Sequence, residues 1–238
     1  MNTFSIRYRF ALPNGQEHVF SLDLDKDTAE LTNAAVVPAP QWTELEFHKC
    51  SNCPLSSDVK HCPSALQLAG VLDRFANVVS YDNVHVTVET EERAVSAHLS
   101  AQQGLASLMG LIMASSGCPR TAVFRPMARF HLPFSSESET AFRSAAMYLL
   151  AQHFIAADGG VADVKLAGLD RLYRGVHAVN RGMAQRLRAA SRQDAVVNAV
   201  VLLDVNTSLV PAAIHELLTE MRPAFAALLQ NMTADEGP

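Results

Sequence analysis

The stretch HKCSNCPLSSDVKHCP (residues 48–63) holds Cys50, Cys53 and Cys62, which are three of the four cysteines in the chain. Their spacing is C-x2-C-x8-C, and the fourth cysteine, Cys118, lies far downstream in the sequence SSGCP. A C-x2-C turn lets two thiolates reach one metal ion, and two thiolates from elsewhere can complete a tetrahedron. We therefore predict that these four cysteines form one metal site, which joins two distant parts of the chain and couples metal binding to folding.

Two kinds of metal site compete for four thiolates. Zinc takes four thiolates in closed structural sites, and an iron–sulfur cluster also takes four. Proline follows Cys53, Cys62 and Cys118, a feature that recurs in iron–sulfur ligand runs but also suits a rigid zinc loop. Zinc is the leading prediction and an iron–sulfur cluster the alternative. Either leaves a charge of about −2 on the ion and its thiolates. Three arginines after the fourth cysteine are candidates to offset that charge: Arg120, Arg125 and Arg129.

The cysteine pattern also has less specific interpretations. A C-x2-C pair inside a cell can be a redox dithiol, and buried cysteines can act as small apolar residues. His48 and His61 flank the cysteines and could each replace one as a ligand. More often a histidine at such a position hydrogen-bonds to a ligand or simply faces water.

Composition restricts the class of protein. The chain has 238 residues, of which 49% are hydrophobic and 18% charged, and its net charge is −5. This length and apolar content suit one or two domains with a sizeable core. Without a basic block, nucleic-acid binding has little electrostatic support. We find no apolar signal-peptide core at the start and no apolar run long enough to span a membrane. We therefore expect a reducing cytoplasm, no membrane partner, and either a homo-oligomer or a protein partner on the apolar helices.

The N-terminal half reads as mixed strand and helix. Alternating apolar residues from Phe4 to Phe10 and from His18 to Leu24 flank a turn signal, which predicts a β-hairpin. A Pro-containing linker, Asn33–Gln41, follows. Beyond the cysteine loop we expect a helix to about Val79, a strand over residues 83–90, a strand or helical turn over 93–99, a buried helix over 102–114, and an irregular segment over 125–134.

The C-terminal part reads as a helical bundle. With Ser136 as its cap and Glu139 completing a capping box, the first helix should run to Asp158. Helices over residues 166–187 and 195–203 follow, and Pro211 should open the last one. The apolar residues expected on the buried face of the first helix are Phe142, Ala145, Ala146, Leu149, Leu150 and Phe154.

The fold class predicted from these elements is α+β and predominantly helical, with an N-terminal β-hairpin or small sheet, a Cys-rich loop and a C-terminal helical bundle. We divide the chain into residues 1–41 (hairpin and linker), 42–134 (Cys-rich α+β core) and 135–238 (helical bundle). The bundle is expected to form one compact unit with the core.

A second candidate site lies in the irregular segment, where RPMARFHLPF (residues 125–134) is rich in arginine, histidine and aromatic residues. Arg125, Arg129 and His131 could line a pocket and bind an anionic ligand or a partner carboxylate. The more common alternative is that the arginines pair with acids such as Glu137 and Glu139, and that His131 packs in the core.

Four motifs carry a resemblance to a known family: WTELEFHKCSNCPL, HCPSAL, SLMGLIMASSGCP and MARFHLPF. With them the chain resembles a bacterial family known only as a domain of unknown function. The resemblance implies a shared cysteine-based site at Cys50, Cys53, Cys62 and Cys118, and it implies no activity. The chain also lacks a P-loop, a Rossmann glycine pattern, G-x-S-x-G and H-E-x-x-H. No motif therefore assigns it to an enzyme class, and the sequence leaves enzymatic activity open.

We therefore expect a cytoplasmic metal-binding protein whose four-cysteine site holds zinc in a structural or regulatory role. The alternative is an iron–sulfur or dithiol redox protein or sensor, in which enzymatic activity remains open and Arg125, Arg129 and His131 line the substrate side.

Overall fold

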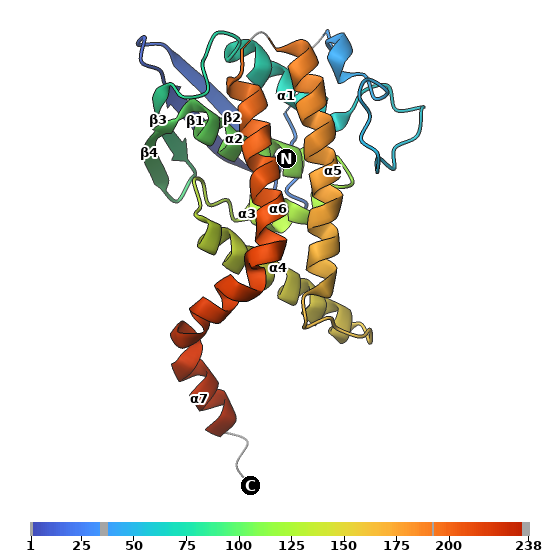
Figure 1. Cartoon of the computed structure of the whole chain (residues 1–238), viewed down its shortest axis with the longest axis vertical. Helices are drawn as coiled ribbons and strands as arrows, with labels where there is room; N and C mark the ends of the chain where they lie inside the picture. Colours follow the sequence, from blue (N-terminus) through green and yellow to red (C-terminus); the bar gives the residue numbers. More distant parts are fainter. Residues whose placement is uncertain (1, 34–37, 192, 235–238) are drawn as a thin grey trace.

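The computed structural model describes residues 2–33, 38–191 and 193–234. The protein is α+β and predominantly helical, with a small sheet against one end of a set of long helices (Figure 1). The predicted fold class is confirmed. Of the predicted linker, residues 34–37 lie outside the described part of the chain.

Within the described residues, four strands form one antiparallel sheet. They are β1 (Thr3–Ala11), β2 (Glu17–Asp25), β3 (Asn83–Glu89) and β4 (Ala94–Ser100), in the order β2-β1-β3-β4. The predicted hairpin is confirmed as β1 and β2. The segment over residues 93–99, for which a strand or a helical turn was expected, forms strand β4 from Ala94 onward. Strand β1 pairs with both β2 and β3. The hairpin therefore shares its sheet with residues 42–134, the predicted Cys-rich core.

One face of the sheet packs on α2 (Ala101–Ser115), the buried helix that its apolar sequence predicts. Strand alternation turns Ile6, Tyr8 and Phe10 inward, where they are almost fully buried. Gly104 allows the close approach of helix and sheet, because a Cβ atom there would lie 2.9 Å from the Phe10 ring.

Two further helices, α1 and α3, come before and after α2 in the sequence. Cys62 is the N-cap of α1 (Pro63–Arg74), which ends before the predicted Val79 because the chain turns at the buried Phe75. The segment expected to be irregular contains a helical turn, α3 (Arg125–Arg129), so that expectation was wrong for its first half. Proline near the start of α3 suits a first helical turn.

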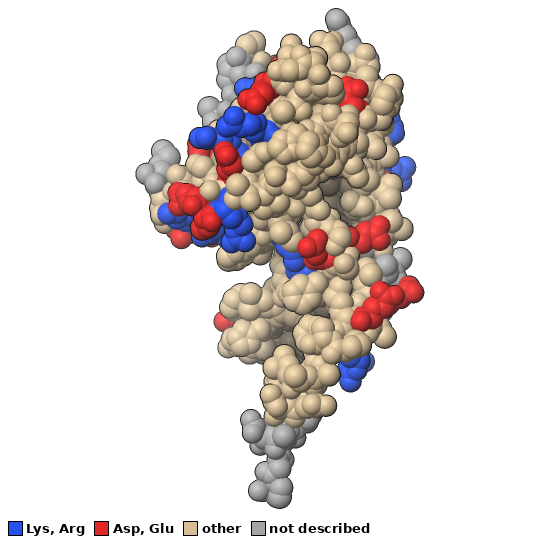
Figure 2. Space-filling model, turned by 90° about the vertical axis from the view of Figure 1, so that its left-hand side faces the viewer, with Lys and Arg blue, Asp and Glu red and all other residues tan. Residues whose placement is uncertain are grey.

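Helix α4 (Glu137–Ala157) begins at the predicted cap, where Ser136 and Glu139 form a capping box. The predicted buried face was largely wrong, because Phe142 is 46% and Phe154 58% exposed. Of the predicted residues Ala145 is buried, and the other buried side chains of α4 are Ala141, Ser144, Tyr148 and Gln152. Figure 2 views the molecule from the left-hand side of Figure 1. The lower part of this face is mostly uncharged, whereas charged side chains of both signs gather higher up.

Two long helices stand side by side over the rest of the fold, α5 (Ala167–Ala190) and α6 (Ala195–Met221) (Figure 1). The prediction that Pro211 opens a separate helix was wrong, because α6 runs through it. After a 3-10 turn, α7 (Ala226–Ala234) extends away from the body (Figure 1). No helix among the described residues is both long and apolar enough to cross a membrane.

Candidate functional site: a four-cysteine cluster

The cysteine loop is closed at its base by a short ladder of backbone hydrogen bonds. Cys62 N donates to Thr43 O at 2.8 Å, and Leu45 N donates to Lys60 O at 2.9 Å. Within the loop, Cys53 N donates to Cys50 O at 3.0 Å, which forms the tight turn expected of a C-x2-C pair. The loop therefore presents three cysteines from one folded unit.

The end of α2 brings Cys118 to this unit. Gly117 adopts a positive φ of 85° and lies against Pro63, so the chain reverses beside the start of α1. Next to it, the hydroxyl oxygens of Ser64 and Ser116 are 2.7 Å apart. Cys118 thus reaches the neighbourhood of Cys62 although the two are far apart in sequence.

A third contact ties Cys118 to the C-x2-C turn. The Nε of Arg120 donates to Asn52 O at 2.8 Å. Asn52 lies between Cys50 and Cys53, and its side-chain amide donates to Gly175 O of α5 at 2.8 Å. The cysteine loop, the end of α2 and α5 are therefore joined around the cysteines.

Helix α5 packs on the cysteine cluster at Gly182. A Cβ atom on Gly182 would lie 2.7 Å from the Sγ of Cys50 and 3.3 Å from its Cα, so only glycine fits there without displacing the loop. The Sγ of Cys50 is also 3.8 Å from Val179 O. The helix backbone itself therefore forms one wall of the site.

Arg186, one turn further along α5, is the charged group of this wall. It is 1% exposed, and its Nη1 donates to Trp42 O at 2.9 Å and Glu44 O at 2.6 Å, while Nη2 donates to Leu45 O at 2.7 Å. Its Nε has no hydrogen-bond partner. No carboxylate of the described residues forms an ion pair with it. The site thus contains a buried cation whose charge is compensated only by carbonyl dipoles.

The four thiols are free and lie close enough to influence one another's charge. Burial raises the pKa of Cys50 to about 11, the neighbouring Cys62 adds to this rise, and Arg186 opposes it. Burial also raises the pKa of Cys62, against backbone hydrogen bonds and Arg186. Without a further cation, both thiols stay protonated at neutral pH. Among the residues that the structure describes, no three Cys, His, Asp or Glu side chains adopt an arrangement that could hold a metal ion. An ion would therefore have to draw the thiols closer together than they lie here.

Comparison with known proteins places the chain among its relatives. The family described as a domain of unknown function, DUF6901, matches residues 6–226. The chain belongs to this family. No curated protein and no solved structure matches it. The family assignment confirms the resemblance read from the sequence and brings no activity with it.

The two histidines near the cysteines of this DUF6901 chain have local contacts. His48 has a positive φ of 47°, and its ring packs on Phe47 at 4.8 Å between centroids. His61 places its Nδ1 2.9 Å from the Thr43 hydroxyl. The His61 contact joins the two ends of the cysteine loop, whereas that of His48 is with its sequence neighbour.

Of the three arginines singled out from the sequence, Arg120 bonds to the cysteine loop at Asn52 O, and the other two have separate surroundings. Arg125 forms an ion pair with Glu30, and the guanidinium of Arg129 lies over the Phe4 ring at 4.4 Å. The arginine at the thiols, Arg186, was missed. The signal that could have found it is a charge at helical spacing from Val179 and Met183 on the buried stripe of α5.

His131 lines a cavity whose described lining includes neither Arg125 nor Arg129, and it belongs to a buried polar chain. Its Nε2 is 2.5 Å from the Tyr8 hydroxyl, which is 2.7 Å from the Ser107 hydroxyl. Burial, assisted by the positive charge of Arg143, lowers the pKa of His131 from 6.5 to about 3. His131 is therefore neutral at physiological pH.

This burial predicts a pH dependence of stability. Between pH 6.5 and about 3 the unfolded chain binds a proton at His131 that the folded protein does not, so the free energy of unfolding falls as the pH falls. The slope is up to about 1.4 kcal/mol per pH unit. Urea unfolding between pH 7 and pH 5 should show a shallower loss for His131→Gln than for the unmodified protein. The same replacement at exposed His153 on α4 should leave the profile unchanged; equal slopes in all three proteins would refute the assignment.

Proposed function

We propose that this protein is a cytoplasmic metal-binding protein in which Cys50, Cys53, Cys62 and Cys118 hold one zinc ion as thiolates beneath α5. The ion would have a structural or regulatory role, because it would join the cysteine loop to the end of α2. Bound zinc would supply the charge that keeps the thiols deprotonated.

One observation supports this proposal most, the buried Arg186 beside the thiols. A cation taken out of water is costly unless an anion compensates it. Four thiolates around zinc carry a charge of about −2. Of the charged groups of α5, Arg186 is the one whose positive charge acts on both Cys50 and Cys62. Its carbonyl contacts to the loop base would hold the guanidinium in position whether or not an ion is present.

The donor set suits the proposal in a second way. All four ligand candidates are cysteines at the edge of an apolar core, and Cys62 and Cys118 are each 8% exposed. Closed zinc sites use such all-protein ligand sets, with no open position for substrate. An iron–sulfur cluster would use the same four thiolates, and the experiment below separates the two.

The test is a metal analysis of protein purified without oxygen. We expect about one zinc per chain, little visible absorption, and a lower melting temperature after chelation. Cys50→Ser and Cys118→Ser should each lose most of the metal and melt at lower temperature. Ser51→Ala, an exposed change inside the same loop, is the control and should retain both.

The outcomes distinguish the alternatives. Iron together with a broad visible band would replace zinc by an iron–sulfur cluster and make a redox or sensor role the better proposal. Protein that contains neither metal, and whose melting is unaffected by both cysteine substitutions, would contradict a metal site and leave the thiols as core residues.

A further inference from the structure

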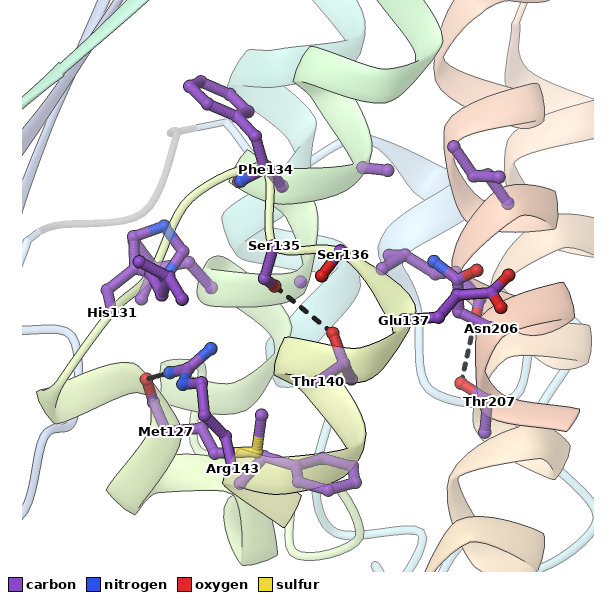
Figure 3. A pocket seen from close by; sticks show the side chains of 18 of the residues that line it. Met127, His131, Phe134, Ser135, Ser136, Glu137, Thr140, Arg143, Asn206 and Thr207 are labelled. Carbon is purple, nitrogen blue, oxygen red and sulfur yellow. Dashed lines mark hydrogen bonds between the residues drawn. The ribbon is translucent and has the colours of Figure 1, made fainter. Parts of the chain in front are cut away.

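A cavity of about 670 Å³ lies between α2, the α3 segment, α4 and α6 (Figure 3). It is distinct from the cysteine cluster, and none of the four cysteines lines it. Its volume falls within the range of roughly 300–1,000 Å³ that small organic ligands occupy in proteins. The protein therefore has room for a ligand at a place that the cysteines do not explain.

The inner wall of the cavity is apolar. Helix α2 contributes Ala106, Gly110 and Leu111, and α6 contributes Leu202 and Leu203. A Cβ atom on Gly110 would lie 3.4 Å from the Leu203 side chain, so α2 and α6 are in close contact at this wall. A wall of this kind binds the hydrocarbon part of a ligand by removing it from water.

A cation stands at the opposite wall. Arg143 is half-buried, and its Nη2 donates to the carbonyl oxygens of Met127 and Phe130, both at 2.9 Å. No carboxylate of the described chain forms an ion pair with it. Burial lowers the pKa of Arg143, an effect that Glu139 opposes from a distance. The two carbonyls orient the guanidinium without neutralising it.

Three other titratable groups line this space, and one of them, Tyr173, stays neutral because burial raises its pKa; its hydroxyl oxygen is 2.5 Å from that of Ser144. His131 is neutral and bonded to Tyr8, so it adds hydrogen-bonding capacity without a competing charge. Glu137 lies at the exposed rim, and Figure 3 shows its carboxylate directed toward Asn206, away from Arg143. The cavity is thus polarised, with a positive end at Arg143 and an acidic rim at Glu137, where the start of α4 faces α6.

We propose that this cavity binds an amphipathic organic anion, a monocarboxylate with an aliphatic or aromatic body. Its carboxylate accepts hydrogen bonds from Arg143 at the His131 end, and its body lies along α2 and α6. The orphaned charge at one end and the apolar wall at the other select this chemistry: a cation is repelled by Arg143, and a neutral molecule leaves that charge uncompensated.

The experiment is a calorimetric titration of the full chain with decanoate, below its micelle concentration, at pH 7.5. We expect saturable binding at one site per chain. Decan-1-ol should bind roughly tenfold more weakly, since it lacks the charge-assisted hydrogen bonds, and decyltrimethylammonium should not bind.

Three variants locate the site. Arg143→Gln, which retains hydrogen-bond donors, should weaken decanoate binding by about tenfold or more. Asn206→Trp, an exposed change at the mouth of the cavity, should abolish binding with the fold intact. Arg174→Gln removes an exposed arginine of α5 that pairs with Asp170, and it should bind as the unmodified protein does.

The proposal is overturned if decanoate shows no saturable binding, or if the alcohol and the quaternary amine bind as tightly as the acid. It is equally overturned if Asn206→Trp binds normally, or if Arg174→Gln loses as much affinity as Arg143→Gln. The last result would mean that only net charge matters. Should Arg143→Gln fail to fold, Asn206→Trp together with the three probes still decides between these outcomes.

Discussion

Replacing Arg186 by methionine should lower the free energy of unfolding by about 4 kcal/mol. Each hydrogen bond from a charged donor contributes roughly 1.5–3 kcal/mol, and the three are not fully additive. The replacement leaves the carbonyl groups of Trp42, Glu44 and Leu45 without their guanidinium donor at the base of the cysteine loop. Urea unfolding monitored by circular dichroism measures the loss.

Arg188→Met is the matched control for this prediction. Arg188 lies on the same helix but is exposed, so the same chemical change should alter stability by no more than about 0.5 kcal/mol. If the two variants lose equal stability, the contacts of Arg186 with the loop contribute nothing specific. If zinc is bound as proposed, Arg186→Met should also lower the zinc content, whereas Arg188→Met should not.

Gly182→Ala should destabilise the protein by about 2 kcal/mol, because its new methyl group overlaps Cys50 and overpacking costs roughly 1–3 kcal/mol. The backbone of Cys50 is part of the obstacle, with its Cα 3.3 Å from the new atom, so rotation of the thiol alone does not make room. The displaced loop should also expose its thiols, which a maleimide or disulfide reagent would label faster.

The control for this prediction is another glycine of α5. A Cβ atom on Gly175 would lie 3.9 Å from its nearest neighbour, the side-chain amide nitrogen of Asn52, which is an ordinary contact. Gly175→Ala should therefore stabilise the helix by roughly 0.5–1 kcal/mol. Unfolding energies that rise in both variants would show that α5 is not held against Cys50 as tightly as described.

Local sequence patterns predicted the parts of the fold whose causes are local. The alternation of β1 and β2 and the capping box at Ser136 are set by neighbouring residues. The cysteine spacing likewise predicted the tight turn between Cys50 and Cys53. Pro211 misled because a proline removes one helical hydrogen bond but does not oblige the helix to end, since the turns on either side can continue it.

The buried face of α4 could not be predicted from the helical periodicity of its apolar residues. Large apolar residues mark one side of the helix, but the side that packs inward is held by hydrogen bonds of polar residues. The hydroxyl oxygens of Ser144 and Tyr173 are 2.5 Å apart, and Gln152 accepts from the backbone N–H of Asp163 at 2.7 Å. These partners lie on other segments, so helical periodicity alone cannot select the face.

The candidate site divides in the same way. The four cysteines could be grouped from their spacing and scarcity, whereas Arg186 and Gly182 could not be assigned to the site. Their roles depend on α5 crossing a loop more than a hundred residues earlier in the chain. Arg143 was likewise missed as the arginine of the cavity, because its position opposite α2 depends on how α4 docks.

The glycine-lined wall of α5 has a consequence for how the protein is made. Chains emerge from the ribosome N-terminus first, so all four cysteines leave the exit tunnel before Gly182 and Arg186 are synthesised. During that interval α5 is not yet present, and only afterwards can it cover Cys50. An ion destined for this site would have its easiest entry on the nascent chain, and the arrival of α5 would then act as a closing step that retains it.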